Sequence, residues 1–354
     1  MTSNRITPPL SNQSNSREYY GALDGLRAYA AIGIVMMHVL ANLQIKPSVN
    51  FLTETIIPYF TNFVFLFMMI SAFGLSCGYF ERIKNNHITP EAFYTKRYKR
   101  VLPFFAIMVM IDLVWEHDCR SLIEGFTDIT LCFGLYPNAN ITVIGVGWFL
   151  GTIFVFYMLY PFFVFLIGNK RRAWITLVIS VALSLIGIYY FGSQKYFVGP
   201  MEFGRSNILY SAPFFVIGGI VYLYRHALSE FVKHYRILAS LAGITLLIST
   251  FAYISQIPTI LSSIIIFTIL LVYSLGSKDI ILNNPIVKYL SKISMEIYLC
   301  HMLFFRVMGI LNIGKYILNP NLLYIVTLMG TLFGAIVFSH MCKFYVINKV
   351  KWLK

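Results

Sequence analysis

The sequence predicts an all-α membrane protein, a polytopic bundle of about ten transmembrane helices with both termini in the cytoplasm. Three observations support this fold class. Apolar residues make up 58% of the chain and charged residues 12%, against roughly 45–50% and 25% in soluble domains. Runs of about 18 or more mostly apolar residues recur along the chain. The basic residues gather in alternate connecting segments, a pattern typical of proteins that cross a membrane repeatedly.

Each apolar run is expected to be a helix, because lipid offers the backbone no hydrogen-bond partner. Residues 121–136 are apolar but too short for a span, so we expect them either to re-enter the membrane or to pack on its outer surface. The ten predicted spans are, in order, residues 23–43, 58–80, 101–117, 145–168, 173–191, 207–224, 236–254, 258–275, 290–310 and 322–346.

The positions of the 28 Lys and Arg residues test this arrangement. With the N-terminus in the cytoplasm, 21 of them fall in inner segments, two fall inside spans and five fall in outer segments. This bias predicts that both termini are cytoplasmic. It also explains the formal net charge of +14 by contact with anionic membrane lipid, so no nucleic-acid partner is expected.

The chain divides into a short tail and one membrane domain. Residues 1–20 are polar and rich in Ser, Asn and Pro, which predicts a disordered cytoplasmic tail without the pattern of a cleavable signal. Residues 21–354 form the predicted transmembrane domain. No metal-binding motif is evident. Cys119 and Cys132 both lie on the predicted outer side, and their spacing leaves a disulfide between them open.

Two ionisable residues share one face of the first predicted span. Eleven positions separate Arg27 from His38, which on an α-helix places the side chains about 20° apart in angle and about 16 Å apart along the axis. Charged and ionisable groups at membrane depth usually line a cavity or a reaction path. Asp24, three positions before Arg27, is placed to pair with it. The alternative is an Arg that reaches the headgroups beside a His bonded to a neighbouring helix.

Other polar residues fall at similar depths in later spans. His301 is expected at mid-membrane depth, either beside the same cavity as His38 or in a bond between helices. Glu296 either orients the His301 ring or forms an ion pair. On the outer side, we expect carboxylates and an aromatic ring at similar height to form a binding surface for a polar ligand. The alternative is that Trp148 belongs to the aromatic belt at the membrane interface and that Arg205 is a solvated loop charge. The candidates for this surface are Glu116, Trp148 and Arg205, with Asp112 and His117 nearby.

The ordered set of motifs resembles the acyltransferase 3 family, integral membrane enzymes that acylate extracytoplasmic sugars. The first is Leu-Asp-Gly-Leu-Arg at 23–27 followed by His38, and the others are at residues 65–73, 93–103, 148–161 and 293–301. The second motif ends Ser-Ala-Phe where the family usually has Ser-Gly-Phe, and Met295 replaces a usual Tyr. The likeness covers most of the chain.

This resemblance implies a membrane O-acyltransferase, most simply an O-acetyltransferase, of a bacterial inner membrane. The donor is then cytoplasmic acyl-coenzyme A, such as acetyl-CoA, without a metal. The acceptor is a cell-surface or exported glycan or a lipid-linked sugar, such as the O-antigen of lipopolysaccharide or an exopolysaccharide. Two rivals remain at this stage. A flippase for a lipid-linked sugar predicts paired halves with broken helices, which are not evident, and a scaffold for glycan assembly predicts that loss of His38 leaves the glycan unchanged.

The resemblance also suggests roles for the candidate residues. His38 is expected either to take the proton from the acceptor hydroxyl or to carry the acyl group itself. Arg27, paired with Asp24, faces the donor phosphates or polarises the thioester. The basic segment before the third span matches an Arg-x-x-Arg pattern, so Arg97 and Arg100, with Lys96, are expected to bind donor phosphates. Its alternative is ordinary positive-inside charge.

Overall fold

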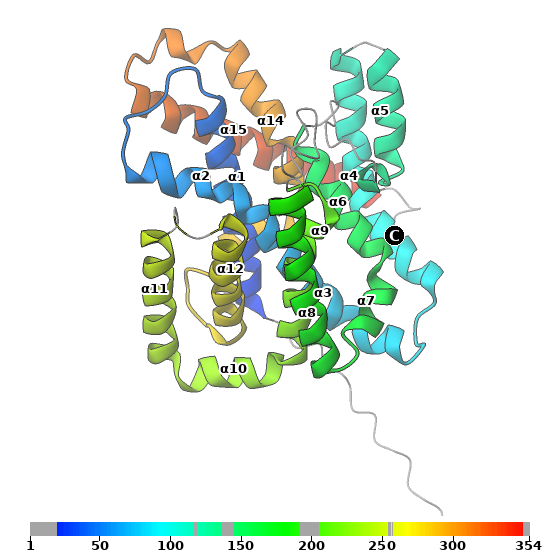
Figure 1. Ribbon diagram of the computed structural model, residues 1–354. Helices are drawn as coiled ribbons and strands as arrows, with labels where there is room; N and C mark the ends of the chain where they lie inside the picture. Colours follow the sequence, from blue (N-terminus) through cyan, green and yellow to red (C-terminus); the bar gives the residue numbers. More distant parts are fainter. Residues whose placement is uncertain are drawn as a thin grey trace, which may run out of the picture.

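The computed structural model describes residues 20–116, 119–135, 145–191, 205–253, 256 and 258–349, and it is helical without β-strands in these ranges (Figure 1). Of the predicted tail, only Tyr20 lies within the described residues. The α-helices are α1 Gly21–Asn42, α2 Ile57–Tyr59, α3 Phe63–Lys84, α4 Pro90–Glu116, α5 Cys119–Ile129, α6 Trp148–Met158, α7 Tyr160–Leu166, α8 Lys170–Ile186, α9 Ile208–Leu223, α10 Arg225–His234, α11 Arg236–Ala252, α12 Thr259–Gly276, α13 Pro285–Lys292, α14 Ser294–Ile310 and α15 Pro320–Met341.

Each of the ten predicted spans coincides with one or two of these helices. Within the described residues, five helical segments are each long and apolar enough to cross a membrane, and eight are if each bent pair counts as one span. The bent pairs are α6 with α7, at 60°, and α9 with α10 and α13 with α14, both at 74°. The two remaining predicted spans correspond to α11, which is shorter, and to α4, whose first half is basic. The chain is a polytopic helical membrane protein.

The helix that contains the third predicted span begins much earlier than the sequence suggested. We expected Pro103 to start a helix, but α4 begins at Pro90 and continues through Pro103. Thr89 caps this start, because its hydroxyl accepts a hydrogen bond from the Ala92 N–H, and Pro90 occupies the first turn, where no N–H is needed. The basic cluster at 96–100 is therefore helical and not a loop.

Asparagines cap four of the other helices. The side-chain oxygen of Asn169, Asn207, Asn284 or Asn319 accepts a backbone N–H in the first turn of α8, α9, α13 or α15, respectively. These bonds satisfy N–H groups that a helix leaves without a partner at its start. The caps fix where each helix begins.

The first helix lies at the centre of the bundle. It packs against α3, α12, α13, α14 and α15, and most of its residues are buried. In Figure 1, α10 lies across the ends of α11 and α12, which it contacts, and α5 runs beside one end of α4. Because α1 has this many neighbouring helices, it can present polar side chains to an interior that lipid does not reach.

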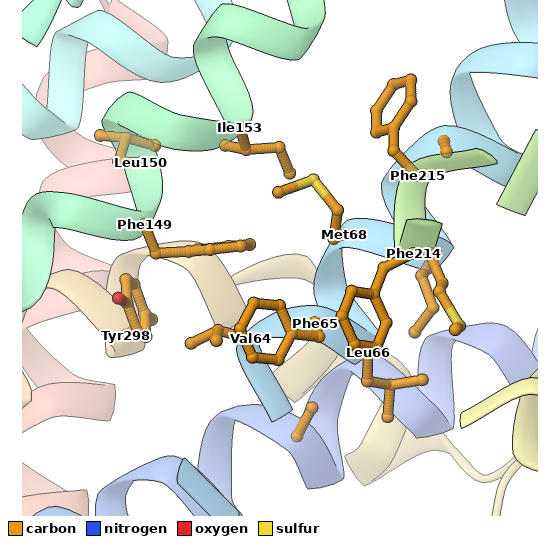
Figure 2. Packing of buried hydrophobic residues seen from close by; sticks show 14 of the residues in the cluster. Val64, Phe65, Leu66, Met68, Phe149, Leu150, Ile153, Phe214, Phe215 and Tyr298 are labelled. Carbon is orange, nitrogen blue, oxygen red and sulfur yellow. The ribbon is translucent and has the colours of Figure 1, made fainter. Parts of the chain in front are cut away.

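Aromatic side chains fill the core between α3, α6, α9 and α14 (Figure 2). The rings of Phe65 and Phe214 are stacked with centroids 4.6 Å apart, which joins α3 to α9. On the same pair of helices, Gly218 lies so close to Met69 that a Cβ on it would be 2.3 Å from the Met69 carbonyl oxygen. Small residues allow such close helix contacts in membranes.

The predicted short apolar segment at 121–136 contains α5, which packs against α4. Its polar residues Ser121 and Asp128 face inward, with 5% and 1% of their surface exposed, whereas Ile123 and Phe126 are 70% and 73% exposed. An apolar outward face with a polar inward face is the pattern of a helix in contact with lipid. The nearby Cys119 and Cys132 are free thiols, so the disulfide that the sequence left open is not formed.

Candidate functional site

The structure brings the two candidate histidines into contact. The Nδ1 of His38 on α1 lies 3.0 Å from the Nε2 of His301 on α14, and their ring centroids are 4.9 Å apart. His301 is fully buried, at 0% exposure, and its Nδ1 lies 2.6 Å from the carbonyl oxygen of Tyr298. His38 is half-buried. The expectation that the two residues lie at similar depth is confirmed.

Tyr298 holds this part of α14 in place. Its hydroxyl donates a hydrogen bond to the carbonyl oxygen of Val146. Its ring meets Phe149 edge-on with centroids 5.9 Å apart, and the two rings lie next to each other in Figure 2. Trp148 is half-buried at the start of α6 and packs edge-on against Phe149. The start of α6, with Trp148, is thereby joined to the histidine pair through Tyr298.

Arg205 lies on the same side of the bundle as the histidine pair. It donates hydrogen bonds to the hydroxyl of Thr61, at 2.6 Å, and to the Thr61 carbonyl oxygen, and it lies over the ring of Phe65. Its charge is close enough to act on His38 and on Tyr298. Arg205 is thus the member of the predicted outer group whose charge acts on His38, and its role toward an acceptor stays a prediction.

The other members of the outer group are placed differently. Asp112 on α4 forms an ion pair with Arg306 on α14, with Nη1 and Oδ1 3.4 Å apart. Glu116 is the last residue of α4, and its side chain lies outside what the structure describes. His117 also lies outside the described residues. The acceptor role of Glu116 stays a prediction from the sequence.

At the opposite end of α1, Arg27 and Asp24 form the predicted ion pair. Nη1 of Arg27 is 3.3 Å from Oδ1 of Asp24, which also accepts a 3.0 Å hydrogen bond from the Ser291 hydroxyl. Both residues line a cavity of about 820 Å³, which we call the Arg27 cavity. Its charged lining residues are Arg27, Lys99, Arg100, Lys292 and Lys343, with Asp24 and Glu296.

The Arg27 cavity carries an excess of positive charge. Two of its cations are paired with carboxylates, Arg27 with Asp24 and Lys343 with Glu296, the latter at 2.6 Å. In the described part of the chain, Arg100 and Lys292 have no ion-pair partner. Glu296 thus forms an ion pair, the second of its two predicted roles, while both ring nitrogens of His301 have other partners.

The basic cluster on α4 divides into two faces. Lys99 and Arg100 line the Arg27 cavity. Arg97 instead donates a 2.8 Å hydrogen bond to the Tyr79 hydroxyl and lies over the Tyr79 ring, 4.9 Å from its centroid. Lys96 is exposed and is not a lining residue. Of the three residues predicted to bind the donor, Arg100 lines this cavity, whereas Arg97 and Lys96 do not, and Lys99, which was not among them, lines it too. The role of Arg97, Arg100 and Lys96 in donor binding stays a prediction.

Sequence reasoning missed Lys292 and Lys343 as candidates. Both belong to the inner segments of the charge pattern, so nothing local distinguished them from ordinary topological charge. Lys292 joins the cavity because α13 packs against α1, and Lys343, in the helical turn that follows α15, joins it because α15 packs against α1 and α14. Both α13 and α15 are more than 240 residues from α1 in the sequence. Within the described residues, no group of three or more His, Cys, Asp or Glu side chains is arranged to hold a metal ion.

The chain is thus a multi-pass helical membrane protein with a cationic cavity at one end of its central helix and a histidine pair toward the other. The model of the acyltransferase 3 family, described as an acyltransferase domain, matches residues 20–340. The chain belongs to this family and is a multi-pass membrane acyltransferase. In the same comparisons, no curated protein and no solved structure matched it.

Proposed function

We propose that this protein transfers an acyl group, most simply acetyl, from cytoplasmic acyl-coenzyme A to a hydroxyl of a cell-surface or exported glycan, such as O-antigen or an exopolysaccharide. One observation carries the proposal. Arg27, in the wall of the cavity, and His38, in the histidine pair, lie on the same face of α1 and are about 16 Å apart along its axis. This separation provides one place for the body of the donor and another for its reactive end.

The Arg27 cavity fits the phosphate-bearing end of coenzyme A. Its volume of about 820 Å³ falls within the range of ligand sites, roughly 300–1,000 Å³. Arg100 and Lys292, which have no ion-pair partner in the described part of the chain, supply charge for phosphate oxygens. With the N-terminal end of α1 in the cytoplasm, as the basic residues predict, the cavity opens toward the cytoplasmic donor pool.

The length of the donor matches the distance to His38. The pantetheine arm of coenzyme A has about twelve backbone bonds, which at the extension of a peptide chain gives roughly 15 Å. Phosphates held at Arg27 and Arg100 therefore place the thioester near His38. The acyl group would reach the far part of the membrane while the nucleotide stays on the near side.

His38 is the group that we propose acts on the acceptor. As general base it takes the hydroxyl proton while the hydroxyl oxygen attacks the thioester carbonyl. The new C–O bond forms, the C–S bond breaks, and the coenzyme A thiolate recovers the proton from His38. In a two-step route, His38 itself accepts the acyl group and passes it to the hydroxyl. Both routes need the same neutral His38.

The acceptor is proposed to approach from the side of Arg205 and Trp148. Arg205 is fixed by two hydrogen bonds to Thr61 and acts electrostatically on His38. A guanidinium held in this way can donate to sugar hydroxyls or to the oxygen that becomes negative during transfer. Trp148 offers an aromatic surface for a sugar ring, and Glu116 a carboxylate.

The test is the transfer of labelled acetyl from acetyl-CoA into the surface glycan by membrane vesicles that carry the protein. We expect His38→Ala to reduce transfer by about 100-fold or more, since it removes the base. His234→Ala, at the end of α10, serves as the matched control and should transfer at the wild-type rate. Unchanged transfer by His38→Ala would remove this residue from the mechanism and contradict the proposal.

A further inference from the structure

We infer that His301 is a positioning residue that fixes the tautomer of His38, so that Nε2 of His38 is the nitrogen that acts as the base. The inference rests on the proposed function, because it concerns how the proposed base is prepared. It is argued from three groups that contact one another in turn, the Tyr298 carbonyl, the His301 ring and the His38 ring.

The series starts at a group that can only accept. Nδ1 of His301 lies 2.6 Å from the Tyr298 carbonyl oxygen, and a carbonyl has no proton to donate. Nδ1 of His301 must therefore carry the hydrogen. The ring is fully buried, and neither of its hydrogen-bond partners is a carboxylate that would balance a positive charge. Because an uncompensated charge is costly in such a place, His301 is neutral and its Nε2 has a free lone pair.

The hydrogen bond between the two histidine rings then has only one possible donor. The lone pair of His301 Nε2 faces Nδ1 of His38 at 3.0 Å, so Nδ1 of His38 must donate the hydrogen. A neutral His38 with its hydrogen on Nδ1 has its lone pair on Nε2. The Tyr298 carbonyl thus acts, through two rings, on which nitrogen of His38 can take a proton. His38 also has a backbone hydrogen bond with Ile34, one turn earlier on α1.

The same contact helps during transfer. When His38 takes the hydroxyl proton at Nε2, it becomes an imidazolium, and its Nδ1–H bond to His301 becomes a charge-assisted hydrogen bond. The His301 lone pair stabilises the cation until the thiolate recovers the proton. His301 itself touches neither substrate in this arrangement, because its ring is fully buried and both of its nitrogens are engaged.

Two substitutions separate this role from simple packing. His301→Leu fills the space but neither donates nor accepts. His301→Gln keeps one amide N–H for the Tyr298 carbonyl and one oxygen that accepts from His38. Cys300→Ala is the matched control, since Cys300 is equally buried on α14 but its sulfur faces Ser339 and Ala335 of α15. The rate at saturating acetyl-CoA and the KM for acetyl-CoA are measured in vesicles containing equal amounts of inserted protein.

We expect His301→Leu to lower the saturated rate by roughly 100-fold or more with the KM for acetyl-CoA within about twofold of wild type, because loss of the correct tautomer impairs the base and not the donor site. His301→Gln should recover at least about tenfold of that loss, and Cys300→Ala should behave as wild type.

A wild-type rate for His301→Leu, while His38→Ala is inactive, would overturn this inference and leave the proposed function standing. A His301→Gln protein that is as slow as His301→Leu would also overturn it. If His38→Ala itself keeps its activity, the proposed function fails as well.

Discussion

Lys96 and Arg100 lie one helical turn apart on α4, and of these two residues Arg100 lines the Arg27 cavity while Lys96 does not. Arg100 belongs to the Arg-x-x-Arg pattern that led to the expectation of donor binding, and Lys96 lies one position before that pattern. Their different positions make them a matched pair for testing where the donor phosphates bind.

Arg100→Gln should raise the KM for acetyl-CoA by about 10- to 100-fold, since a lost hydrogen bond to a charged group costs about 1.5–3 kcal/mol. Lys96→Gln removes the same charge from the same helix and should change the KM by less than about twofold. The measurement is the rate of acetyl transfer against acetyl-CoA concentration. Equal increases for the two variants would show that the effect is one of overall charge and not of the cavity.

Arg97 is expected to stabilise the junction of α3 and α4 more than it binds the donor. Its hydrogen bond to Tyr79 and its place over the Tyr79 ring together correspond to about 1–3 kcal/mol. Arg97→Gln should lower the Tm of the purified protein and raise the KM for acetyl-CoA less than Arg100→Gln does. Tyr79→Phe, which keeps the ring and removes the acceptor, should have an intermediate Tm. An unchanged Tm with a large increase in KM would restore Arg97 to the donor site.

Asp128 on α5, a helix outside the candidate spans, gives a pH dependence of stability. Burial, with the nearby Glu124 and Asp112 carboxylates, raises the pKa of Asp128 to about 7. The folded protein then holds this proton more tightly than the unfolded chain, where the pKa is about 3.9. Stability from this group is complete below about pH 4 and is lost as the pH rises toward 7.

The stability of Asp128→Asn relative to the wild-type protein should therefore increase as the pH rises. We expect the difference in Tm, variant minus wild type, to increase between pH 5 and pH 8 in thermal unfolding of the detergent-solubilised protein. Glu230→Gln on α10, an exposed carboxylate, is the control and should show a constant difference. A constant difference for Asp128→Asn would contradict the raised pKa.

Gly218 is expected to be essential for the contact of α9 with α3. A Cβ at this position would lie 2.3 Å from the Met69 carbonyl oxygen and 2.8 Å from the Ala72 Cβ, so the two helices must separate. Gly218→Ala should lower the free energy of unfolding by about 1–3 kcal/mol. Gly78→Ala, on α3 where nothing lies within 4 Å, is the control and should be tolerated. Thermal unfolding of both variants decides between a packing requirement and a general effect of alanine.

The sequence predicted the features that depend on local periodicity and composition. The helical positions of all ten predicted spans, the Asp24–Arg27 pair and the approach of His301 to His38 agree with the structure. Each follows from helix geometry or from the depth at which an apolar run places a residue. The start of α4 was missed, although the sequence contains a signal for it. Thr89 is a cap, Pro90 is a proline in the first turn, and Glu91 makes that turn acidic.

The composition of the Arg27 cavity could not be predicted in the same way. Lys292 and Lys343 join Lys99 and Arg100 through the packing of helices that are distant in the sequence. No periodicity within one helix specifies which of many inner lysines face a common cavity. The division of α4 into a cavity face with Arg100 and a Tyr79 face with Arg97 likewise depends on the rotation of the helix against its neighbours.

α14 takes part in both the Arg27 cavity and the histidine pair. α14 begins at Ser294, in the wall of the Arg27 cavity, and carries His301 seven residues later, about 10 Å along the same rigid rod. The wall of the Arg27 cavity and the support of His38 therefore belong to one helix, so a substitution that displaces the start of α14 would disturb the contact between the two imidazoles as well as the cavity.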